Sequence, residues 1–408
     1  MPWQVKELLT MKREFVMLAQ PNGTNIAELC RRFGISRECG YKWLRAYQEA
    51  GELGLREKSR RPGSHPLQTG REMEKVVLEL RAKNPAWGGR KLKRRLEHLG
   101  LESVPAASTI TEILRRHGQL RQPGIRVQGP WQRFEYSTPN ELWQMDFKGP
   151  LKLVNSGHCD ILTLLDDHSR FSLAVEACAN QRSETVKERL RAVFGRYGLP
   201  QRILCDNGSP WGSAEAACPY TEFSVWLLRL GVELIHGRPY HPQTQGKQER
   251  FHGSLQVEVL NQSTAWRDIE QCQKRFSQFR DCYNSERPHE ALQMEVPLSR
   301  YRPSLRAMPE KLPELEYLAQ DEVRRVKTKG EVKFKGHLLY VGQAFAGLEV
   351  AFRAGAQEDH WELFFGWKRI GQLNLKELSK AASYRMPLCQ KNPAPLLKGI
   401  GKVGCRKT

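Results

Sequence analysis

Three carboxylates are the residues in this 408-residue chain whose types and spacing could do chemistry. Asp146 lies in a strand-like run at residues 142–147, where an unpaired carboxylate is costly to bury. Asp206 ends a second strand-like run, and Glu249 lies near the start of a polar helix. Carboxylates that come within a few ångströms repel one another unless a cation binds them. A ligand set made only of oxygen favours Mg²⁺ or Mn²⁺, so the sequence predicts a site for such an ion.

Such a site suits the cutting and joining of a phosphodiester. Two ions about 3.5–4 Å apart can stabilise both the attacking and the departing oxygen. We expect two ions per active site, with Asp146 as the bridging ligand and with Asp206 and Glu249 each on one ion. The nucleophile would be water or a DNA 3′-hydroxyl. On this hypothesis the three carboxylates are both the catalytic and the metal-binding residues.

Alternating strands and helices must position these carboxylates. The apolar runs predict five strands, at residues 142–147, 158–165, 171–177, 202–205 and 232–235. Three antiparallel strands followed by two crossovers give a mixed five-stranded sheet with helices packed on it. In the order three-two-one-four-five the first and fourth strands are neighbours, so Asp146 and Asp206 converge. Asp166 and Asp167, between the second and third strands, are expected to be polar turn residues.

The segment before Glu249 joins an extended Pro-x-x-Pro stretch to a helix through a glycine. Its polar side chains could hold a DNA end against the metal site, although a polar loop needs no such role. We predict that five residues here contact DNA: Tyr240, His241, Gln243, Gln245 and Lys247.

Residues 1–50 have the spacing of a helix-turn-helix domain, with a Gly-containing turn between two short helices. Asn25 and Ser36 can cap these helices. The polar face of the second helix would meet a DNA major groove with four residues: Ser36, Arg37, Lys42 and Arg45. An ordinary helical hairpin with a solvated basic face would show the same pattern.

Four further regions surround the expected catalytic core at residues 132–300. Residues 51–70 form a basic linker in which Arg60 and Arg61 could follow phosphates or enter a minor groove, or be merely solvated. Residues 71–120 predict a second helix-turn-helix-like domain, or a plain helical bundle, with a basic face that includes Arg94 and Arg95. Six short strands at residues 318–376 predict a small β-barrel or a sandwich, and residues 377–408 are a basic tail.

The charge of the chain favours a polyanionic partner. The net charge is +20, and residues 1–130 hold 25 Lys and Arg against 13 Glu and no Asp. The ten cysteines form no Cys-x-x-Cys pair and are not spaced with histidines like zinc ligands. No apolar run approaches the ~20 residues that span a bilayer, and no secretory signal opens the chain. We therefore expect no membrane partner and a cytoplasmic location, associated with the bacterial nucleoid.

Three stretches resemble the catalytic core of retroviral integrases and of bacterial insertion-sequence transposases. They are residues 143–147 (WQMDF), 205–209 (CDNGS) and 240–249 (YHPQTQGKQE), and residues 284–292 (NSERPHEAL) also resemble the close of bacterial cores. The resemblance implies an RNase H-like fold with an Asp-Asp-Glu triad at Asp146, Asp206 and Glu249. Forty-two residues separate Asp206 from Glu249, with residues 211–221 as the extra loop, and a zinc-binding amino-terminal module is lacking. Both departures indicate a bacterial member.

The resemblance implies a transposase that binds double-stranded DNA at element ends, cleaves to expose a 3′-OH and joins it to target DNA. Because two ends must be paired, a homo-oligomer, dimer or higher, is expected. Two alternatives fit the same residues. One is a catalytically silent DNA-binding regulator derived from a transposase, and the other is a nuclease of the RNase H class that acts on hybrids without strand transfer.

Overall fold

The computed structural model divides the chain into two compact units, Met1–Gly70 and Arg71–Thr408. It describes residues 5–21, 23–57, 68–120, 135–154, 157–212, 219–237, 246–263, 265–378 and 384–385. Six residues predicted to contact DNA lie outside these ranges: Arg60, Arg61, Tyr240, His241, Gln243 and Gln245. Among the described residues, no helix is long and apolar enough to cross a membrane.

The first unit is helical, with elements α1 (Val5–Ala19), α2 (Ile26–Arg32), α3 (Arg37–Ala50) and the 3₁₀ turn η1 (Gly51–Leu55). Both predicted caps are present. The Asn25 side chain accepts from the first backbone amides of α2, and Ser36 accepts from the amide of Cys39 at 3.2 Å. Helix α3 packs closely on the others at Gly40, where a Cβ atom would lie 2.6 Å from the sulfur of Cys30 and 2.8 Å from the ring of Phe15. A side chain at position 40 would therefore separate α3 from the small core of this unit.

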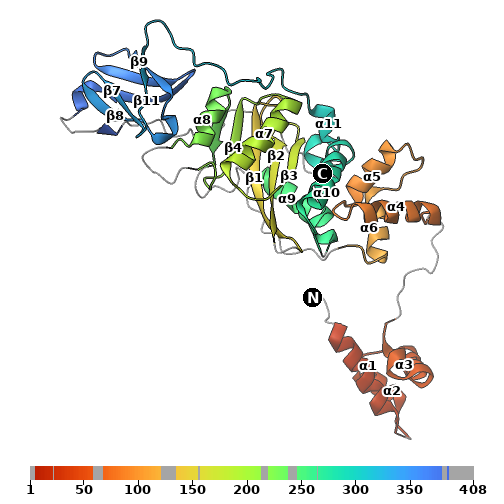
Figure 1. Cartoon of the computed structure of the whole chain (residues 1–408). Coiled ribbons are helices and arrows are strands. Elements are labelled where there is room, and N and C mark those ends of the chain that lie inside the picture. The colour runs from red at the N-terminus through yellow and green to blue at the C-terminus, as the bar shows by residue number, and fades with distance from the viewer. Residues whose placement is uncertain are drawn as a thin grey trace. The chain divides into compact units, whose positions relative to one another are not determined.

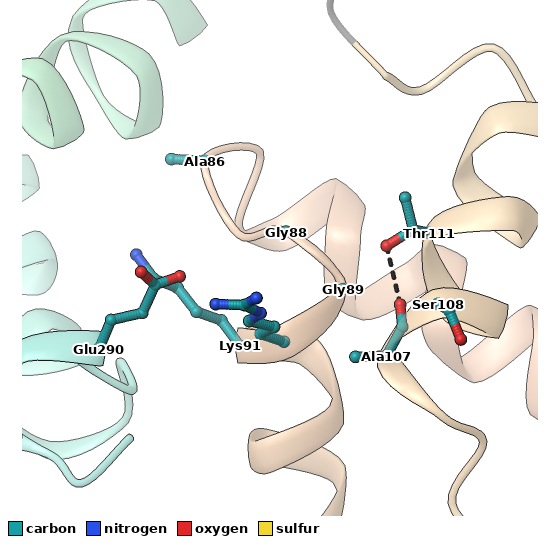
Figure 2. Close-up of a pocket in the computed structure, with 9 residues that line it drawn as sticks. Ala86, Gly88, Gly89, Lys91, Ala107, Ser108, Thr111 and Glu290 are labelled. Carbon is teal, nitrogen blue, oxygen red and sulfur yellow. Dashed lines mark hydrogen bonds between the residues drawn. The ribbon is translucent and has the colours of Figure 1, made fainter. Parts of the chain in front are cut away.

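The second unit begins with three helices, α4 (Arg71–Lys83), α5 (Gly89–His98) and α6 (Ala107–Arg116). Their shared core includes the fully buried Trp87 and Leu92. The first turns of α5 and α6 touch, since a Cβ atom on Gly89 would lie 2.3 Å from the carbonyl oxygen of Ala107 (Figure 2). The sequence pattern of Thr109 followed by Glu112 predicts a helix that starts at Thr109, and this prediction is wrong. Helix α6 begins two residues earlier, after Ala106, which offers no side-chain cap.

The α/β region contains the predicted five strands: β1 (Leu142–Lys152), β2 (His158–Asp166), β3 (Ser172–Cys178), β4 (Arg202–Cys205) and β5 (Glu233–His236). Strand β1 runs five residues further than predicted, and the ends of the others differ by at most one residue. Their order is β3-β2-β1-β4-β5, as the sequence predicted. Strand β1 pairs antiparallel with β2 and parallel with β4. The predicted mixed sheet, and with it an RNase H-like core, is confirmed.

Helices cover both faces of this sheet (Figure 1). Helices α7 (Ser183–Tyr197) and α8 (Glu222–Arg229) pack on one face, against a core that includes Trp143 and Met145. Helices α9 (Gly246–Glu258) and α10 (Ile269–Ser285) pack on the other. Because side chains alternate along a strand, Asp146 lies on the α9 side of β1. Short helical turns complete the core: η3 (Leu260–Gln262), η4 (Glu290–Leu292) and α11 (Pro297–Arg300).

The C-terminal region holds all six predicted strands and a seventh: β6 (Glu322–Arg325), β7 (Glu331–Phe334), β8 (His337–Tyr340), β9 (Glu349–Ala354), β10 (His360–Phe365), β11 (Lys368–Asn374) and β12 (Tyr384–Arg385). They pair as two sheets, β11-β10-β9-β6 and β12-β8-β7. The short turns η5 (Gln343–Phe345) and η6 (Leu375–Glu377) join or end strands. Phe334 and Phe352 stack between the sheets at 3.8 Å, so the two sheets share one core.

A buried ion pair ties α9 to the sheet. Asp166 ends β2 and Asp167 begins the turn that follows, as expected of polar turn residues, and both are fully buried. Asp167 accepts from the side-chain amide of Gln144 at 2.7 Å and forms an ion pair with Lys247, in the first turn of α9. Burial lowers the pKa of Lys247 to about 8, although the charge of Asp167 opposes that shift. This pair orients the turn that carries Glu249.

We expect Asp167→Asn to lower the free energy of unfolding by about 3 kcal/mol, because it leaves the buried ammonium of Lys247 without its carboxylate. Urea denaturation at pH 7 measures this loss. The double variant Asp167→Asn/Lys247→Met removes both charges and should recover most of it. Equal stability of Asp167→Asn and the wild type would contradict the role given to this pair.

Candidate active site

Asp146 interacts with both of the other predicted catalytic carboxylates. Its side chain, in the middle of β1, is 22% exposed. Burial raises the pKa of Asp146 from 3.8 to about 6, and the charges of Asp206 and, more weakly, Glu249 add to this shift. The sheet order and the helix on its face thus bring the three carboxylates into electrostatic contact, as the sequence predicted from strand adjacency.

Asp206 is exposed and directly follows β4. Its Oδ1 accepts from the amide of Gly208 at 3.0 Å and from the indole N–H of Trp211. Trp211 is fully buried, and its ring stacks on Phe147, beside Asp146, at 5.3 Å and 10°. Trp211 therefore links the loop after β4 to the strand of Asp146. The sequence analysis missed this residue, because the loop has no periodicity that would indicate a buried ring.

Glu249 is exposed in the first turn of α9, which is fixed to β1 by its neighbours. The side-chain amide of Gln248 donates to the carbonyl oxygen of Gln144 at 2.7 Å. Within the described ranges, no three His, Cys, Asp or Glu side chains are gathered closely enough to hold a metal. The metal site at Asp146, Asp206 and Glu249 stays a prediction.

A histidine joins these residues, and the sequence analysis did not single it out. His252 lies one helical turn after Glu249, on the buried side of α9. Its Nδ1 is 3.8 Å from Oδ2 of Asp146, and its Nε2 is 2.8 Å from the hydroxyl of Thr163 on β2. Its three-residue spacing from Glu249 was the available signal, since residues at that spacing share a helix face.

The residues predicted to bind DNA have different surroundings. Arg37, Lys42 and Arg45 are exposed on α3, and the 50%-exposed ring of Tyr41, which the sequence analysis missed, lies on the same helix. The other two residues, Ser36 and Lys247, also stabilise the fold. Ser36 caps α3, and the ammonium of Lys247 is directed into the core by Asp167.

Part of the basic face of α5 forms ion pairs within the second unit. Arg94 forms an ion pair with Glu295, and Arg95 forms one with Glu286. Helix α5 is therefore bound to residues 284–295, the closing segment of the core. Beside these pairs lies a cavity of about 490 Å³. Figure 2 shows Lys91 of α5 and Glu290 of the closing segment on its wall. The cavity contains none of the three carboxylates and is a separate feature.

Family models match most of the chain. Integrase core domain models match residues 137–242 and 230–297. A helix-turn-helix domain matches residues 11–63, and a homeodomain-like domain matches residues 39–114. The C-terminal domain of IS481 family transposases matches residues 321–381.

Retroviral polyproteins are among the curated relatives. The Gag-Pol polyprotein of Feline leukemia virus is 28% identical over 156 residues, which are 38% of this chain and 8% of the polyprotein. The Gag-Pro-Pol polyprotein of Mason-Pfizer monkey virus is 33% identical over 124 residues, 30% of this chain and 6% of the polyprotein. The chain thus spans less than a tenth of these relatives.

Two viral assemblies are among the similar solved structures. A chain of the simian T-cell lymphotropic virus intasome in complex with PP2A regulatory subunit B56 gamma is 16% identical, with a TM-score of 0.36. The match covers 73% of this chain and 98% of that one. The HTLV-2 integrase catalytic core domain in complex with magnesium, in its dimeric form, is 17% identical over 40% of this chain and 97% of that one, with a TM-score of 0.29.

An integrase core domain preceded by helix-turn-helix domains makes the chain similar to transposases and integrases. The C-terminal part of the chain is similar to that of IS481 family transposases, and its core is similar to that of retroviral integrases. The family predicted from the three sequence stretches is confirmed. The superfamily of these proteins is one of polynucleotidyl transferases, and the helix-turn-helix domains imply DNA binding.

The raised pKa of Asp146 predicts a pH-dependent effect on stability. Because this pKa lies above the ordinary 3.8, the charge of Asp146 destabilises the fold fully above pH 6 and not at all well below 3.8. Asp146→Asn should therefore raise the free energy of unfolding by roughly 1–3 kcal/mol at pH 7.5 in EDTA, and by far less at pH 4.

Denaturation at the two pH values measures this difference. Glu249→Gln is the matched control, since Glu249 is exposed and its substitution should change stability little. A gain for Asp146→Asn that is equal at both pH values, or a loss at pH 7.5, would show that the carboxylate is not held under repulsion.

Proposed function

We propose that the chain is an active DNA transposase that binds the ends of its element, cleaves to expose a 3′-OH and joins that 3′-OH to target DNA. One observation carries this proposal. Asp146 lies on β1 and Asp206 directly follows β4, the strand paired in parallel with β1, and the charges of Asp206 and Glu249 both act on Asp146. Repulsion of this kind within an integrase core supports catalysis, because sites that bind cations are where like charges are held near one another.

The three carboxylates fit two Mg²⁺ or Mn²⁺ ions, because they offer only oxygen at the first coordination positions. Asp146 would contact both ions, and Asp206 and Glu249 would each contact one. When bound, the ions would supply positive charge to the attacking and departing oxygens. Trp211 and the amide of Gly208 occupy Oδ1 of Asp206, which leaves Oδ2 for an ion.

The proposed chemistry has two balanced steps. In the first, a water oxygen bonds to phosphorus and the bond from phosphorus to the 3′-oxygen breaks, which leaves a 3′-OH on the element. In the second, that 3′-oxygen bonds to a phosphorus of target DNA, and the corresponding bond in the target breaks. Each step breaks one P–O bond and forms one, so no external energy source is needed.

Recognition of the element ends is assigned to the helical domains. Arg37, Lys42 and Arg45 on α3 would enter a major groove, with Ser36 at the start of the helix and Tyr41 beside them. Residues 71–120 would extend the site. The two C-terminal sheets would act as a small barrel-like module on DNA, and six further residues would add contacts along the backbone: Arg60, Arg61, Tyr240, His241, Gln243 and Gln245.

Pairing of two DNA ends requires at least a dimer. The cleavage and joining reactions would take place on the nucleoid in the cytoplasm. Lys247 is proposed to contribute mainly by orienting α9 through Asp167, because its ammonium lies in that ion pair. Its predicted contact with DNA would need that pair to open.

Joining assays with the full chain, Mg²⁺ and duplex element ends test the proposal. Glu249→Gln should reduce joined products about 100-fold or more while DNA binding is unchanged, because it removes one carboxylate from the charge-stabilising set. Joining at the wild-type rate would contradict the assigned role. A wild type that only binds DNA would support a silent regulator, and degradation of RNA–DNA hybrids would support a nuclease.

Trp211→Phe should slow joining about tenfold while the fold is kept. Phenylalanine can preserve the stack on Phe147 but cannot donate to Asp206, so that carboxylate loses one of its two described donors. The free energy of unfolding should fall by about 1–2 kcal/mol. Trp211→Ala is the control for packing and should cost about 3–5 kcal/mol. A phenylalanine variant that joins DNA at the wild-type rate would show that the indole N–H does not position Asp206.

A further inference from the structure

His252 lies against the proposed active site and has no role in the chemistry described so far. It is buried, with 9% of its surface exposed, on the side of α9 that faces β1 and β2. Its Nδ1 is 3.8 Å from Oδ2 of Asp146. The inference below rests on the proposed function, because it concerns the ion that Asp146 would bind.

The hydrogen bonds around Thr163 fix the tautomer of this histidine. The Thr163 hydroxyl donates its one proton to the carbonyl oxygen of Asp146, at 2.9 Å. At its second contact, 2.8 Å from Nε2 of His252, the hydroxyl oxygen must therefore accept. The proton of the neutral imidazole consequently lies on Nε2, and Nδ1 carries a lone pair.

Nδ1 lies 3.8 Å from the carboxylate of Asp146, and neither the lone pair nor an ionised carboxylate can donate a hydrogen bond. Two acceptors directed at one another are stabilised by a cation between them. Ligands of one ion at about 2.1 Å each can be up to about 4.2 Å apart, and 3.8 Å lies within that limit.

We propose that Nδ1 of His252 is a nitrogen ligand that, together with the Asp146 carboxylate, binds a divalent first-row transition ion and makes the site favour Mn²⁺ over Mg²⁺. Mg²⁺ takes oxygen ligands and keeps its waters, whereas transition ions accept imidazole nitrogen. Thr163 acts behind this ligand, since its hydroxyl fixes both the ring orientation and the tautomer. An all-oxygen triad would lack this preference.

Electron spin-echo spectroscopy of Mn²⁺ on the EDTA-treated full-length chain tests the proposal. The wild type should show modulation from a directly bound ¹⁴N. In His252→Gln the side-chain amide can still donate to Thr163, but the imidazole lone pair is gone. That variant should lose the ¹⁴N modulation and bind Mn²⁺ about tenfold more weakly, while the Kd for Mg²⁺, measured by competition, changes less than twofold.

His158→Gln is the matched control. His158 also lies beside a carboxylate, 3.3 Å from Oδ2 of Asp160, but its side chain is 58% exposed and far along β2 from Thr163. Its substitution should change neither the modulation nor either affinity. Equal weakening of Mn²⁺ and Mg²⁺ binding in His252→Gln would overturn the proposal, because it would indicate a purely steric role.

Asp146→Asn separates failure of this inference from failure of the proposed function. If Mn²⁺ binding depends on Asp146 but the wild type shows no ¹⁴N modulation, the nitrogen ligand is wrong and the carboxylate site stands. If Asp146→Asn leaves Mn²⁺ binding unchanged, the ion does not bind at the proposed site, and both proposals are overturned.

Discussion

Electrostatic repulsion among three carboxylates is the constraint on which the rest of the core depends. Asp146, Asp206 and Glu249 come from a strand, a loop and a helix, and their charges oppose the approach of these elements. Buried contacts hold the elements in place. The parallel pairing of β1 with β4 fixes the first two carboxylates, and the Lys247–Asp167 ion pair fixes the helix that carries the third. Part of the stability of the scaffold thus offsets this repulsion and keeps the proposed cation site assembled.

Two sets of contacts hold these carboxylates in place. Trp211 joins Asp206 to Phe147, the neighbour of Asp146, through one hydrogen bond and one ring stack. On the opposite side, α9 is bound to β1 by Gln248 and to the turn after β2 by Lys247. A carboxylate held in this way needs little reorganisation when an ion or a phosphate arrives, which is the usual source of catalytic stabilisation by fixed groups.

Much of the core could be predicted from the sequence, because its strands are apolar runs and the rules of strand connection allow few orders of the strands in the sheet. Buried polar groups could not. Asp166 and Asp167 stand in a tight connection, where aspartate is usually an exposed turn former, and only the tertiary contacts with Asn140, Ser169 and Lys247 reveal their burial. The basic face of α5 was ambiguous for the same reason. Charge patterning does not distinguish a DNA phosphate from Glu286 and Glu295 of the same chain.

The most direct measurement is anomalous scattering from Mn²⁺ in crystals of the full-length chain bound to duplex element ends. The account predicts peaks within about 2.5 Å of carboxylate oxygens of Asp146, Asp206 and Glu249, with one ion shared through Asp146. Peaks confined to other carboxylates, such as Asp160 or the acidic residues of the closing segment, would contradict it. A crystal structure with DNA fully bound but no metal at the three carboxylates would also contradict the account.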